Sequence, residues 1–350
     1  MTNMNYQLLG KTGLRVADFC LGTMTFGEDW GWGAAKDEAR KIYDFYREQG
    51  GNFIDTANIY TNGTSEKLVG EFIGDHRSEV VLATKYTNSA PGTNPNAGGN
   101  QRKTMMEAVE ASLRRLKTDY IDLYWMHIWD QMTPAEEVMR AFDDLVRQGK
   151  VLYIGISDAP AWWVAKANTL AEMRGWTSFA GLQIEYNLNE RTPERELLPM
   201  AKEFGLTITA WSPLAGGVLT GKYLDDAPKG EPGRMAAEGN DAMRKDKAHE
   251  DRIARAVIAV AKKIGASPAQ VALAWLRYAS VPVIPIIGAK KLSQLEDNLG
   301  SAAVELSTED RQVLQEASAI TLGFPHEFYA LPMVNSFIYG GLGDRIKARP

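Results

Sequence analysis

Four polar side chains, Asp55, Tyr60, Lys85 and His127, stand at or near the ends of three successive apolar runs of the sequence. Each of them alone has an ordinary structural explanation: a turn cap, a half-buried loop aromatic, a solvated strand end, and a core histidine satisfied by a backbone carbonyl. For the four residues together a purely structural explanation is weaker, because burying several ionisable groups close to one another is costly unless they pair. The pattern favours a proton-transfer group over a packing solution.

The chemistry open to such a group is specific. A phenol titrates at about pH 10 in water, so it donates its proton reluctantly at neutral pH. A neighbouring ammonium is expected to lower the pKa of Tyr60, while the carboxylate of Asp55 keeps Lys85 charged and oriented. His127 would hydrogen-bond the substrate oxygen or assist the proton movement. We therefore predict a general acid that protonates an oxyanion as it forms on a carbonyl carbon.

Other chemistries are less attractive. No nucleophile–base pair and no ligand spacing for a metal stand out, so reduction is favoured over hydrolysis and no metal is predicted. Reduction also requires a hydride source. The one cysteine, Cys20, lies in an apolar run, where a packed core thiol is more common than a nucleophile.

Composition limits the kind of protein and its partners. The chain has 45 % hydrophobic and 24 % charged residues, values typical of a soluble globular protein with a large core. A formal net charge of −5 and a pI near 5.6 argue against nucleic acid or an anionic membrane as the main partner. We see no signal peptide and no apolar stretch of about 18 residues. With no possible internal disulfide, the expectation is a cytoplasmic protein whose partner is a small molecule and whose oligomeric state is open.

The elements that must position these residues recur regularly. Eight short apolar runs, each able to form a strand buried on both faces, lie at 18–26, 52–60, 80–86, 121–127, 153–158, 181–187, 206–214 and 281–289. Amphipathic helical patterns separate them, and repeated strand–helix alternation implies parallel strands with right-handed crossovers. Eight such units predict a (β/α)₈ TIM barrel, with active-site residues at the carboxyl ends of the strands. The alternative is a doubly wound open sheet, which a G-x-G-x-x-G turn after the first strand would favour, and that turn is absent.

Helix boundaries and additions to the barrel are also indicated. Thr133 and Ser267, each followed by proline, predict helix caps. The stretch 6–16 predicts a hairpin over the bottom of the barrel, and 223–250 a long loop. We expect one domain over 1–350, with the barrel at about 17–300, an extra C-terminal helix, and a tail at about 320–350 that packs on something because it is rich in aromatics.

At this point the sequence resembles the aldo-keto reductase family. The stretch GNFIDTANIY…SEKLVGEF is similar to the first signature of that family, with Asp55 and Tyr60 at its tetrad positions. LATKY matches the lysine segment and IDLYWMH the histidine segment. The match continues through GKVLYIGISD, LQIEYN, AWSPLAGGVLTGKY and IPIIGAKKLSQLEDN, and so covers about residues 6–300.

The resemblance implies a nicotinamide cofactor bound across the barrel mouth without a Rossmann domain. NADPH is expected more than NADH, because the helix start at Lys290 and Lys291 suits a 2′-phosphate. The positions matching cofactor contacts of the family are Thr23, Met24, Asp55, Ser157, Asp158, Gln183, Trp211, Ser212, Pro213, Leu214, Ala215, Gly216, Lys222, Arg234, Gly288, Lys290, Gln294, Asp297 and Asn298.

Within this set the resemblance assigns parts of the cofactor. Ser157, Asp158 and Gln183 fall where the family grips the carboxamide, and Trp211 falls where an aromatic ring stacks on the nicotinamide. The family usually has tyrosine at the stacking position, and this chain is similar to the subgroup with WSPL. It usually has asparagine where Asp158 stands, and an aspartate accepts from the carboxamide NH₂ but does not donate to its carbonyl. The segment from Ser212 to Lys222 matches the loop over the pyrophosphate.

The predicted activity is the reversible reduction of an aldehyde or ketone, with hydride from the cofactor and the proton from Tyr60. Trp30, Trp32, Tyr86 and Trp129 are candidates for an apolar substrate mouth, with ordinary rim packing as the alternative. A rival function is that of the potassium-channel β subunits, which share the fold and the WSPL loop and act partly as cofactor-binding regulators. In those subunits the histidine is replaced, so His127 favours an enzyme. A metal-dependent or sugar-phosphate barrel enzyme would need carboxylates on the later strands.

Overall fold

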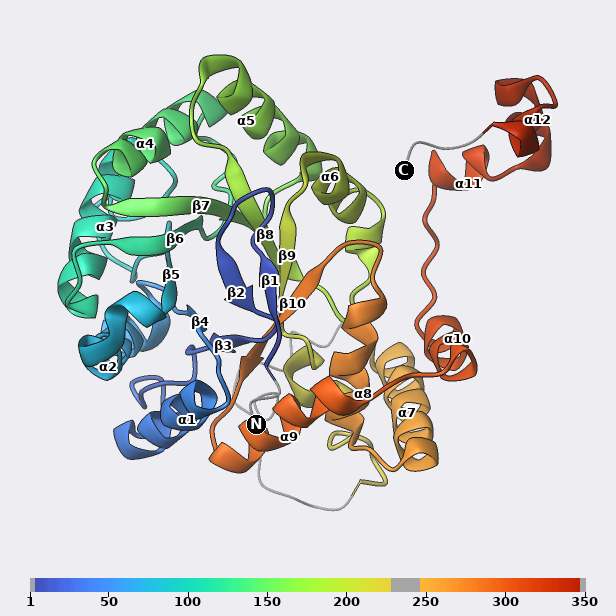
Figure 1. The fold of residues 1–350 in the computed structure, drawn as a ribbon, viewed down its shortest axis with the longest axis horizontal. Helices are drawn as coiled ribbons and strands as arrows, with labels where there is room; N and C mark the ends of the chain where they lie inside the picture. The colour runs from blue at the N-terminus through green and yellow to red at the C-terminus, as the bar shows by residue number, and fades with distance from the viewer. Residues whose placement is uncertain (1–3, 228–245, 347–350) are drawn as a thin grey trace.

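The computed structural model describes residues 4–227 and 246–346. At the centre of Figure 1 is a closed barrel of eight parallel strands in the order β10-β3-β4-β5-β6-β7-β8-β9. These strands are β3 (Cys20–Gly22), β4 (Phe53–Asp55), β5 (Val81–Tyr86), β6 (Ile121–Met126), β7 (Val151–Ser157), β8 (Phe179–Glu185), β9 (Thr207–Trp211) and β10 (Val283–Gly288). The predicted (β/α)₈ barrel is confirmed, and the open doubly wound sheet is excluded because β10 pairs with both β9 and β3.

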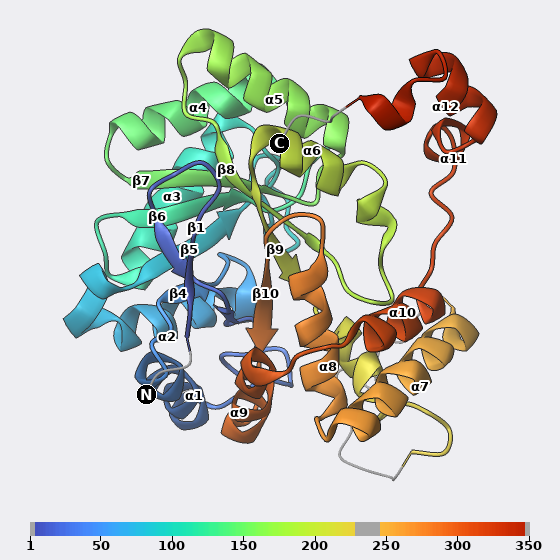
Figure 2. The same ribbon diagram turned by 45° about the vertical axis from the view of Figure 1, so that its right-hand side comes forward.

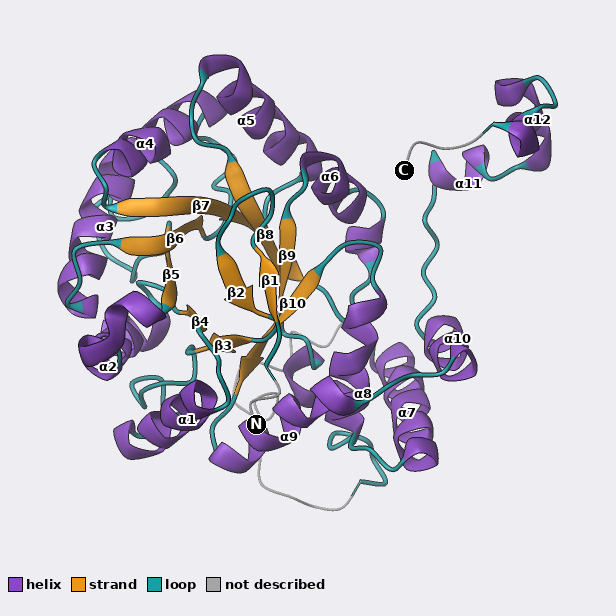
Figure 3. Ribbon diagram, in the orientation of Figure 1, coloured by secondary structure: helices purple, strands orange, loops and turns teal. Residues whose placement is uncertain are grey.

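Helices surround the barrel, as the purple ribbons around the orange strands of Figure 3 show. The crossover helices are α1 (Lys36–Glu48), α2 (Thr64–Phe72), α3 (Arg102–Leu116), α4 (Ala135–Arg147), α5 (Ala161–Arg174), α6 (Leu197–Phe204) and α8 (Pro268–Trp275), and α9 (Leu292–Gly300) follows the last strand. Two further helices, α7 (Lys247–Ile264) and α10 (Thr308–Ala317), pack against each other outside this ring. The apolar face of each crossover helix lies on the strands: in α4 the buried side chains include Val138, Phe142 and Leu145.

Local sequence signals explain some helix starts and not others. Ser267 caps α8 as predicted, because its hydroxyl accepts from the amide of Gln270 while the Gln270 side chain accepts from the amide of Ser267. The prediction of Thr133 as a cap is wrong. Its hydroxyl donates to Asp130 Oδ2 at 2.6 Å, and α4 begins after Pro134 without a side-chain cap. The carboxylate of Asp130 therefore organises the turn before α4.

The predicted N-terminal hairpin is confirmed, formed by β1 (Tyr6–Leu8) and β2 (Arg15–Ala17). The amide of Gly10 in its turn donates to Thr207 Oγ1 at 2.8 Å, and Thr207 is the first residue of β9. A Cβ at Gly10 would lie 2.3 Å from the carbonyl oxygen of Ala180, so this close approach to the barrel requires glycine. The hairpin thus covers the amino ends of the strands, opposite the expected active site.

The indole of Trp125 packs against two glycines of neighbouring barrel strands. Trp125 on β6 is fully buried, and an ideal Cβ at Gly155 on β7 would lie 2.2 Å from its ring. A Cβ at Gly181 on β8 would lie 2.9 Å from the same ring. The two glycines therefore make the space for Trp125, which is the register neighbour of Lys85 on β5.

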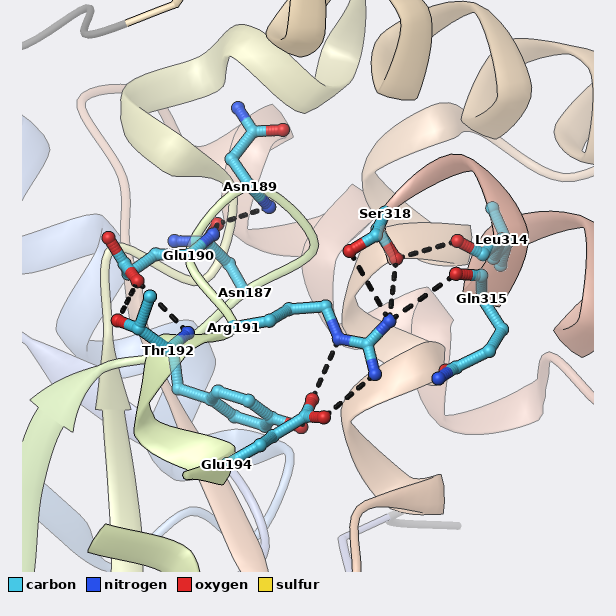
Figure 4. Close-up of polar contacts among 10 residues, drawn as sticks. Asn187, Asn189, Glu190, Arg191, Thr192, Glu194, Leu314, Gln315 and Ser318 are labelled. Atoms are coloured by element: carbon cyan, nitrogen blue, oxygen red, sulfur yellow. Dashed lines mark hydrogen bonds and ion pairs between the residues drawn. The ribbon is translucent and has the colours of Figure 1, made fainter. Parts of the chain in front are cut away.

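The C-terminal region leaves the barrel after α10. Arg191, in the loop between β8 and α6, is buried and donates to both carboxylate oxygens of Glu194, at 2.7 and 2.8 Å, and to Ser318 Oγ at 3.0 Å (Figure 4). This contact ties the end of α10 to the barrel. Beyond it, α11 (His326–Tyr329), α12 (Pro332–Tyr339) and the turn Gly343–Arg345 stand apart from the barrel in Figures 1 and 2.

The tail contacts the barrel through polar groups at its start: Arg195 donates to the carbonyl of Thr321 at 2.6 Å, and His326 Nε2 lies 3.4 Å from Glu196 Oε1. The packing expected of its aromatic side chains is not formed within the described residues. Phe324 and Phe337 are 84 % and 75 % exposed, and Val334 is the one buried apolar side chain of α11 and α12. The predicted loop at 223–250 extends too far along the sequence, because α7 begins at Lys247 with Asp246 as its cap. Arg234, expected to contact the cofactor, lies outside the described residues.

No single helix of the described ranges 4–227 and 246–346 is long and apolar enough to cross a membrane. By length and composition only, α7 and residues 268–278 together are long and apolar enough, but these two segments are bent by 104° relative to each other.

Candidate active site

The four predicted catalytic residues come from three neighbouring strands at the carboxyl end of the barrel. Asp55 is the last residue of β4, Lys85 the last but one of β5, and His127 follows β6 directly. Tyr60 begins a 3₁₀ turn, η1 (Tyr60–Gly63), in the connection that leaves β4. Adjacent parallel strands bring their ends to one edge, which is why residues distant in sequence converge here.

Lys85 is the centre of the group. Its fully buried ammonium donates to a carboxylate oxygen of Asp55 in a very short contact, to the carbonyl of Thr56 at 2.8 Å, and to the hydroxyl of Tyr60 at 3.1 Å. The other oxygen of Asp55 accepts from Gln183 Nε2 at 3.1 Å. All three ammonium protons thus have acceptors. Because the Tyr60 oxygen accepts from Lys85, its own proton is left to be donated elsewhere.

Burial and charge act in opposite directions on this group. Burial by itself lowers the pKa of Lys85, but the attractions and hydrogen bonds of Asp55 and Tyr60 together outweigh it, so the pKa is raised and the ammonium stays charged. For Tyr60 the expected lowering is wrong for the cofactor-free chain. Burial raises the pKa of this phenol by more than the Lys85 ammonium lowers it.

His127 is held in its neutral form. Burial, and then the Lys85 charge, lower its pKa well below the ordinary 6.5. Its Nδ1 lies 3.2 Å from the side-chain nitrogen Nδ2 of Asn88, which can only donate, so the ring proton is carried on Nε2. The backbone oxygen of Asn88 in turn accepts from Asn58 Nδ2 at 2.9 Å. Neither asparagine was expected from the sequence, since nothing in a loop residue type signals a histidine partner.

Next to the four residues, three neighbouring strands carry polar side chains. Ser157 on β7 is the register neighbour of Gln183 on β8, which in turn neighbours Thr209 on β9. The hydroxyls of Ser157 and Thr209 are buried and have no hydrogen-bond partner in the described part of the chain. Buried unpaired hydroxyls are costly in a finished fold, so they fit a ligand that supplies donors and acceptors, such as a carboxamide. Thr209 was not expected from the sequence.

Asp158 and Trp211, expected at the nicotinamide, contact each other directly. The indole Nε1 of Trp211 donates to Asp158 Oδ1 at 3.0 Å. Asp158 has a left-handed backbone with φ of +45°. Burial raises the pKa of its carboxyl to about 6, against smaller lowering effects of the Trp211 hydrogen bond and the Lys85 charge.

This raised pKa predicts an unusual stability profile. A carboxyl whose pKa is about 6 in the folded chain and 3.8 ordinarily is costly once ionised, so the cost grows as pH rises from about 4 to about 6 and stays constant above. We expect Asp158→Asn to raise the free energy of unfolding of the cofactor-free protein at pH 8 by up to about 3 kcal/mol. At pH 4 the gain should vanish. Chemical denaturation at both pH values measures it, and a gain independent of pH would contradict the assignment.

The loop after β9 contains several residues with a left-handed backbone. Residues Ser212, Ala215, Gly216 and Gly217 have φ of +50°, +49°, +62° and +94° around the turn η4 (Ala215–Thr220). Pro213 and Leu214 lie between them in the chain. A Cβ at Gly217 would lie 2.6 Å from the Lys222 ammonium, so this lysine folds back over the loop. A flexible cation above a tight turn fits an anionic group such as a pyrophosphate.

At the end of β10 the predicted residues divide into two groups. Gly288 and Lys290 are at the surface, and the Lys290 ammonium lies 5.4 Å from the ring centre of Trp32. The side chain of Asp297 instead accepts from Ser267 and Gln270 on α8, and Asn298 is buried. Gln294 accepts from the amide of Lys290 at 2.8 Å, which closes the turn into α9.

One amide of the α9 amino end is already used. The amide of Leu292 donates to Glu38 Oε1 of α1 at 2.9 Å. This hydrogen bond, and then the charges of Lys41 and Lys291, lower the pKa of Glu38. The expectation that these amides are open to a phosphate is therefore corrected for Leu292, because a carboxylate occupies it. Sequence reasoning missed Glu38, which lies 254 positions away along the chain.

The two remaining early positions lie at the edge of the site. The hydroxyl of Thr23 donates to the carbonyl of Asp55 at 3.0 Å, and the side chain is buried beneath the loop. Met24 is partly exposed beside it.

Of the predicted mouth residues, three tryptophans lie in loops at the carboxyl end of the barrel and one tyrosine does not. The rings of Trp30 and Trp32 lie 5.9 Å apart, tilted by 43°, and Trp129 packs edge-on against Trp162 at 5.5 Å. Tyr86 is wrong as a mouth residue. It alternates with Lys85, so its ring points out of the barrel, is fully buried, and packs against Phe142 of α4. Exposed Ile128, Met132 and Trp162 were missed.

Comparison with known proteins finds a matching family and several similar proteins. The family described as Aldo/keto reductase family matches residues 18–319. The chain is 40 % identical over 326 residues to norsolorinic acid reductase stcV of Emericella nidulans, covering 90 % of this chain and 82 % of that protein. It is 37 % identical over 338 residues to an aryl-alcohol dehydrogenase [NADP(+)] of Phanerodontia chrysosporium, covering 91 % and 87 %. It is 38 % identical over 339 residues to the uncharacterized oxidoreductase YrpG of Bacillus subtilis, covering 93 % and 100 %.

Proposed function

Because the chain belongs to the aldo/keto reductase family, we propose that it reduces the carbonyl group of an aromatic aldehyde or ketone with NADPH, using Tyr60 as the proton donor. Members of this family are NAD(P)H-dependent oxidoreductases, and carbonyl reduction is the general activity that the relatives support. The single observation behind the assignment of Tyr60 is the hydrogen bond in which Lys85 donates to the phenol oxygen at 3.1 Å.

The residues of the site suit each requirement of this reaction. The bound cofactor supplies the hydride. As negative charge grows on the substrate oxygen, Tyr60 gives up its proton, and the phenolate that remains is stabilised by Lys85, whose charge Asp55 maintains. Neutral His127, with its proton on Nε2, donates a hydrogen bond to the same substrate oxygen without competing as the acid. In the direction of alcohol oxidation the phenolate takes the proton back.

The cofactor is proposed on the fit of this chain's side chains. Ser157, Asp158 and Gln183 offer polar atoms for a carboxamide, and Ser157 has a buried hydroxyl with no partner in the described residues. Lys222 over the η4 turn suits the pyrophosphate. NADPH is preferred to NADH on the charges of Lys290 and Lys291 at the start of α9, and the name of the fungal aryl-alcohol dehydrogenase includes NADP(+).

An aromatic substrate is proposed from the rim and from the relatives. Trp129 and Trp162 form an edge-on pair beside His127, and Ile128 and Met132 extend the apolar surface. Flat rings gain from such contacts beyond the area that they bury. The relatives include proteins named norsolorinic acid reductase and aryl-alcohol dehydrogenase.

The direct test is turnover. Purified protein is mixed with NADPH and a panel of aromatic and aliphatic aldehydes and ketones, and NADPH oxidation is followed by absorbance. We expect kcat/KM to be highest for aromatic carbonyls. Tight NADPH binding without turnover on any carbonyl would instead support a regulatory cofactor-binding protein, similar to the potassium-channel β subunits.

Glu38 gives a prediction about cofactor preference. Its carboxylate competes for the α9 amino end with the 2′-phosphate that NADPH would place there, so Glu38→Gln should tighten NADPH binding by about two- to fivefold at low salt and leave NADH binding unchanged. Fluorescence titration with both cofactors measures this. The matched control is Asp37→Asn, which removes the same charge from the next residue of α1. Equal effects of the two variants, or of the two cofactors, would exclude a specific role of Glu38.

A further inference from the structure

We propose that Asp158 is a positioning residue that fixes the indole ring of Trp211 through a hydrogen bond, and that it does so as the ionised carboxylate. The contact between the two side chains is independent of any ligand. Its effect on a nicotinamide cofactor rests on the proposed function.

The backbone of Asp158 is held rigidly from two sides. Its amide donates to the carbonyl of Gln183 on β8 at 3.2 Å, and its carbonyl accepts from the amide of Trp129 at 3.3 Å. With φ of +45° between these two bonds, the residue has little freedom to move its carboxylate. Trp211 is the last residue of β9, two strands from β7. Asp158 thus offers a fixed acceptor across the end of β8.

The indole needs such an acceptor. A partly buried Trp211 ring could otherwise rotate about its side-chain torsions, since a flat ring packs in several orientations. The hydrogen bond from Nε1 to Asp158 Oδ1 at 3.0 Å fixes one edge of the ring. By contrast, the buried indole nitrogens of Trp125 and Trp129 have no partner in the described residues, so those rings are held by packing alone.

The ionised form makes the bond strong. A charged acceptor gives a hydrogen bond roughly twice as strong as a neutral one. Trp211 donates to the Oδ1 atom of this carboxylate. The neighbouring Ser157 side chain also favours the ionised form, since it lowers the pKa of Asp158. Burial raises the pKa of Asp158, whereas the charge of the Lys85 ammonium lowers it. The attraction of Lys85 thus helps to explain why an aspartate is tolerated here.

The neighbouring groups leave Asp158 as the residue that changes charge near pH 6. Lys85 stays protonated and His127 stays neutral through that range, and the pKa of Tyr60 is raised above its ordinary 10. Other acidic groups at this end include Asp55, which Lys85 and Gln183 hold, and Glu185, the register neighbour of Trp211. Asp130, in the loop after β6, accepts from the amide of Asn100 and the hydroxyl of Thr133. Protonation of Asp158 weakens its hold on the indole.

The test uses the full-length protein labelled with [¹⁵N]tryptophan. The chain has 9 tryptophans, and the indole signal of Trp211 is identified as the one lost in Trp211→Phe. Between pH 8 and pH 5 we expect this signal to shift with a midpoint near the pKa of Asp158, about 6. In Asp158→Asn the same signal should not titrate, while the other eight behave as in the unchanged protein. An indole signal of Trp211 that is insensitive to pH, or that titrates equally in Asp158→Asn, would overturn the proposal.

A second measurement links the contact to the cofactor. NADP⁺ affinity is titrated at pH 8 and pH 5 for the unchanged protein and for Asp158→Asn, so that titration of the cofactor's own phosphate cancels in the comparison. From pH 8 to pH 5 the NADP⁺ affinity of the unchanged protein should fall by about fivefold more than that of Asp158→Asn, because only the unchanged protein loses a charged hydrogen bond. An equal change in both would limit Asp158 to the indole and remove its role in binding. No NADP⁺ binding by either protein would count against the proposed function, whereas the indole signal would still decide the contact.

Discussion

Replacing Tyr60 with phenylalanine is expected to lower kcat for carbonyl reduction by about 10²- to 10⁴-fold. The phenylalanine ring fills the same space but has no proton to give, and it leaves Lys85 without its third acceptor. NADPH affinity should change by no more than about threefold, because in the proposed reaction the hydroxyl contacts the substrate oxygen and not the cofactor. Steady-state kinetics and a fluorescence titration separate the two quantities.

The chain offers a matched control for this variant. Tyr86 follows Lys85 on β5, and its buried side chain lies on the outer face of that strand. Tyr86→Phe therefore removes a phenol hydroxyl, as Tyr60→Phe does, but outside the barrel. The hydroxyl of Tyr86 donates only a long hydrogen bond, 3.3 Å, to the carbonyl of Asn100. We expect kcat to stay within about twofold and stability to fall by about 1 kcal/mol. Near-full activity of Tyr60→Phe would remove Tyr60 as the proton donor.

Replacing Asp55 with asparagine should cost about 3–5 kcal/mol of unfolding free energy at pH 7. Lys85 is fully buried, and its ammonium would lose the one formal negative charge that it contacts. Removing one partner leaves a buried charge without compensation, and burial then lowers the pKa of Lys85. Denaturant unfolding at pH 7, with far-UV circular dichroism as the probe, measures the loss.

The sign of the pH dependence follows from the same group. In the unchanged protein the pKa of Lys85 is raised, so its contribution is complete below the ordinary value of 10.5 and is lost as pH rises through the raised value. In Asp55→Asn the buried lysine is less costly once it is neutral. The difference in unfolding free energy between the two proteins should therefore shrink at high pH. Adding Lys85→Met to Asp55→Asn should recover most of the stability and none of the activity. A single variant as stable as the parent would show that the pair contributes no net stability.

The barrel was predictable because its signals are local and repeated. Each strand is a short apolar run that must be buried on both faces, and eight alternations with helices leave few topologies. The convergence of Asp55, Lys85 and His127 followed from that topology, since strand ends meet at one edge. The same logic of alternation places Tyr86 outside the barrel once Lys85 is inside, and the prediction of Tyr86 as a mouth residue overlooked it.

What sequence reasoning missed depends on contacts between distant segments and on the balance of burial and charge. Glu38 meets Leu292 only because α1 and α9 pack together, and Asn88 meets His127 only through the loop after β5. The direction of the Tyr60 pKa depends on how much water the fold excludes, which residue types do not reveal. The left-handed backbone that aims Asp158 at Trp211 is likewise a property of the closed barrel.

Trp125 has a consequence for traffic through the protein. Its indole lies in the barrel beside Lys85, and the N-terminal hairpin covers the opposite end, so the barrel axis is blocked below Lys85. Under the proposed function, substrate, product and the replacement proton would therefore all reach Tyr60 from the carboxyl end of the barrel. The reach of a carbonyl from that end, more than the total size of the molecule, would then decide which substrates are reduced.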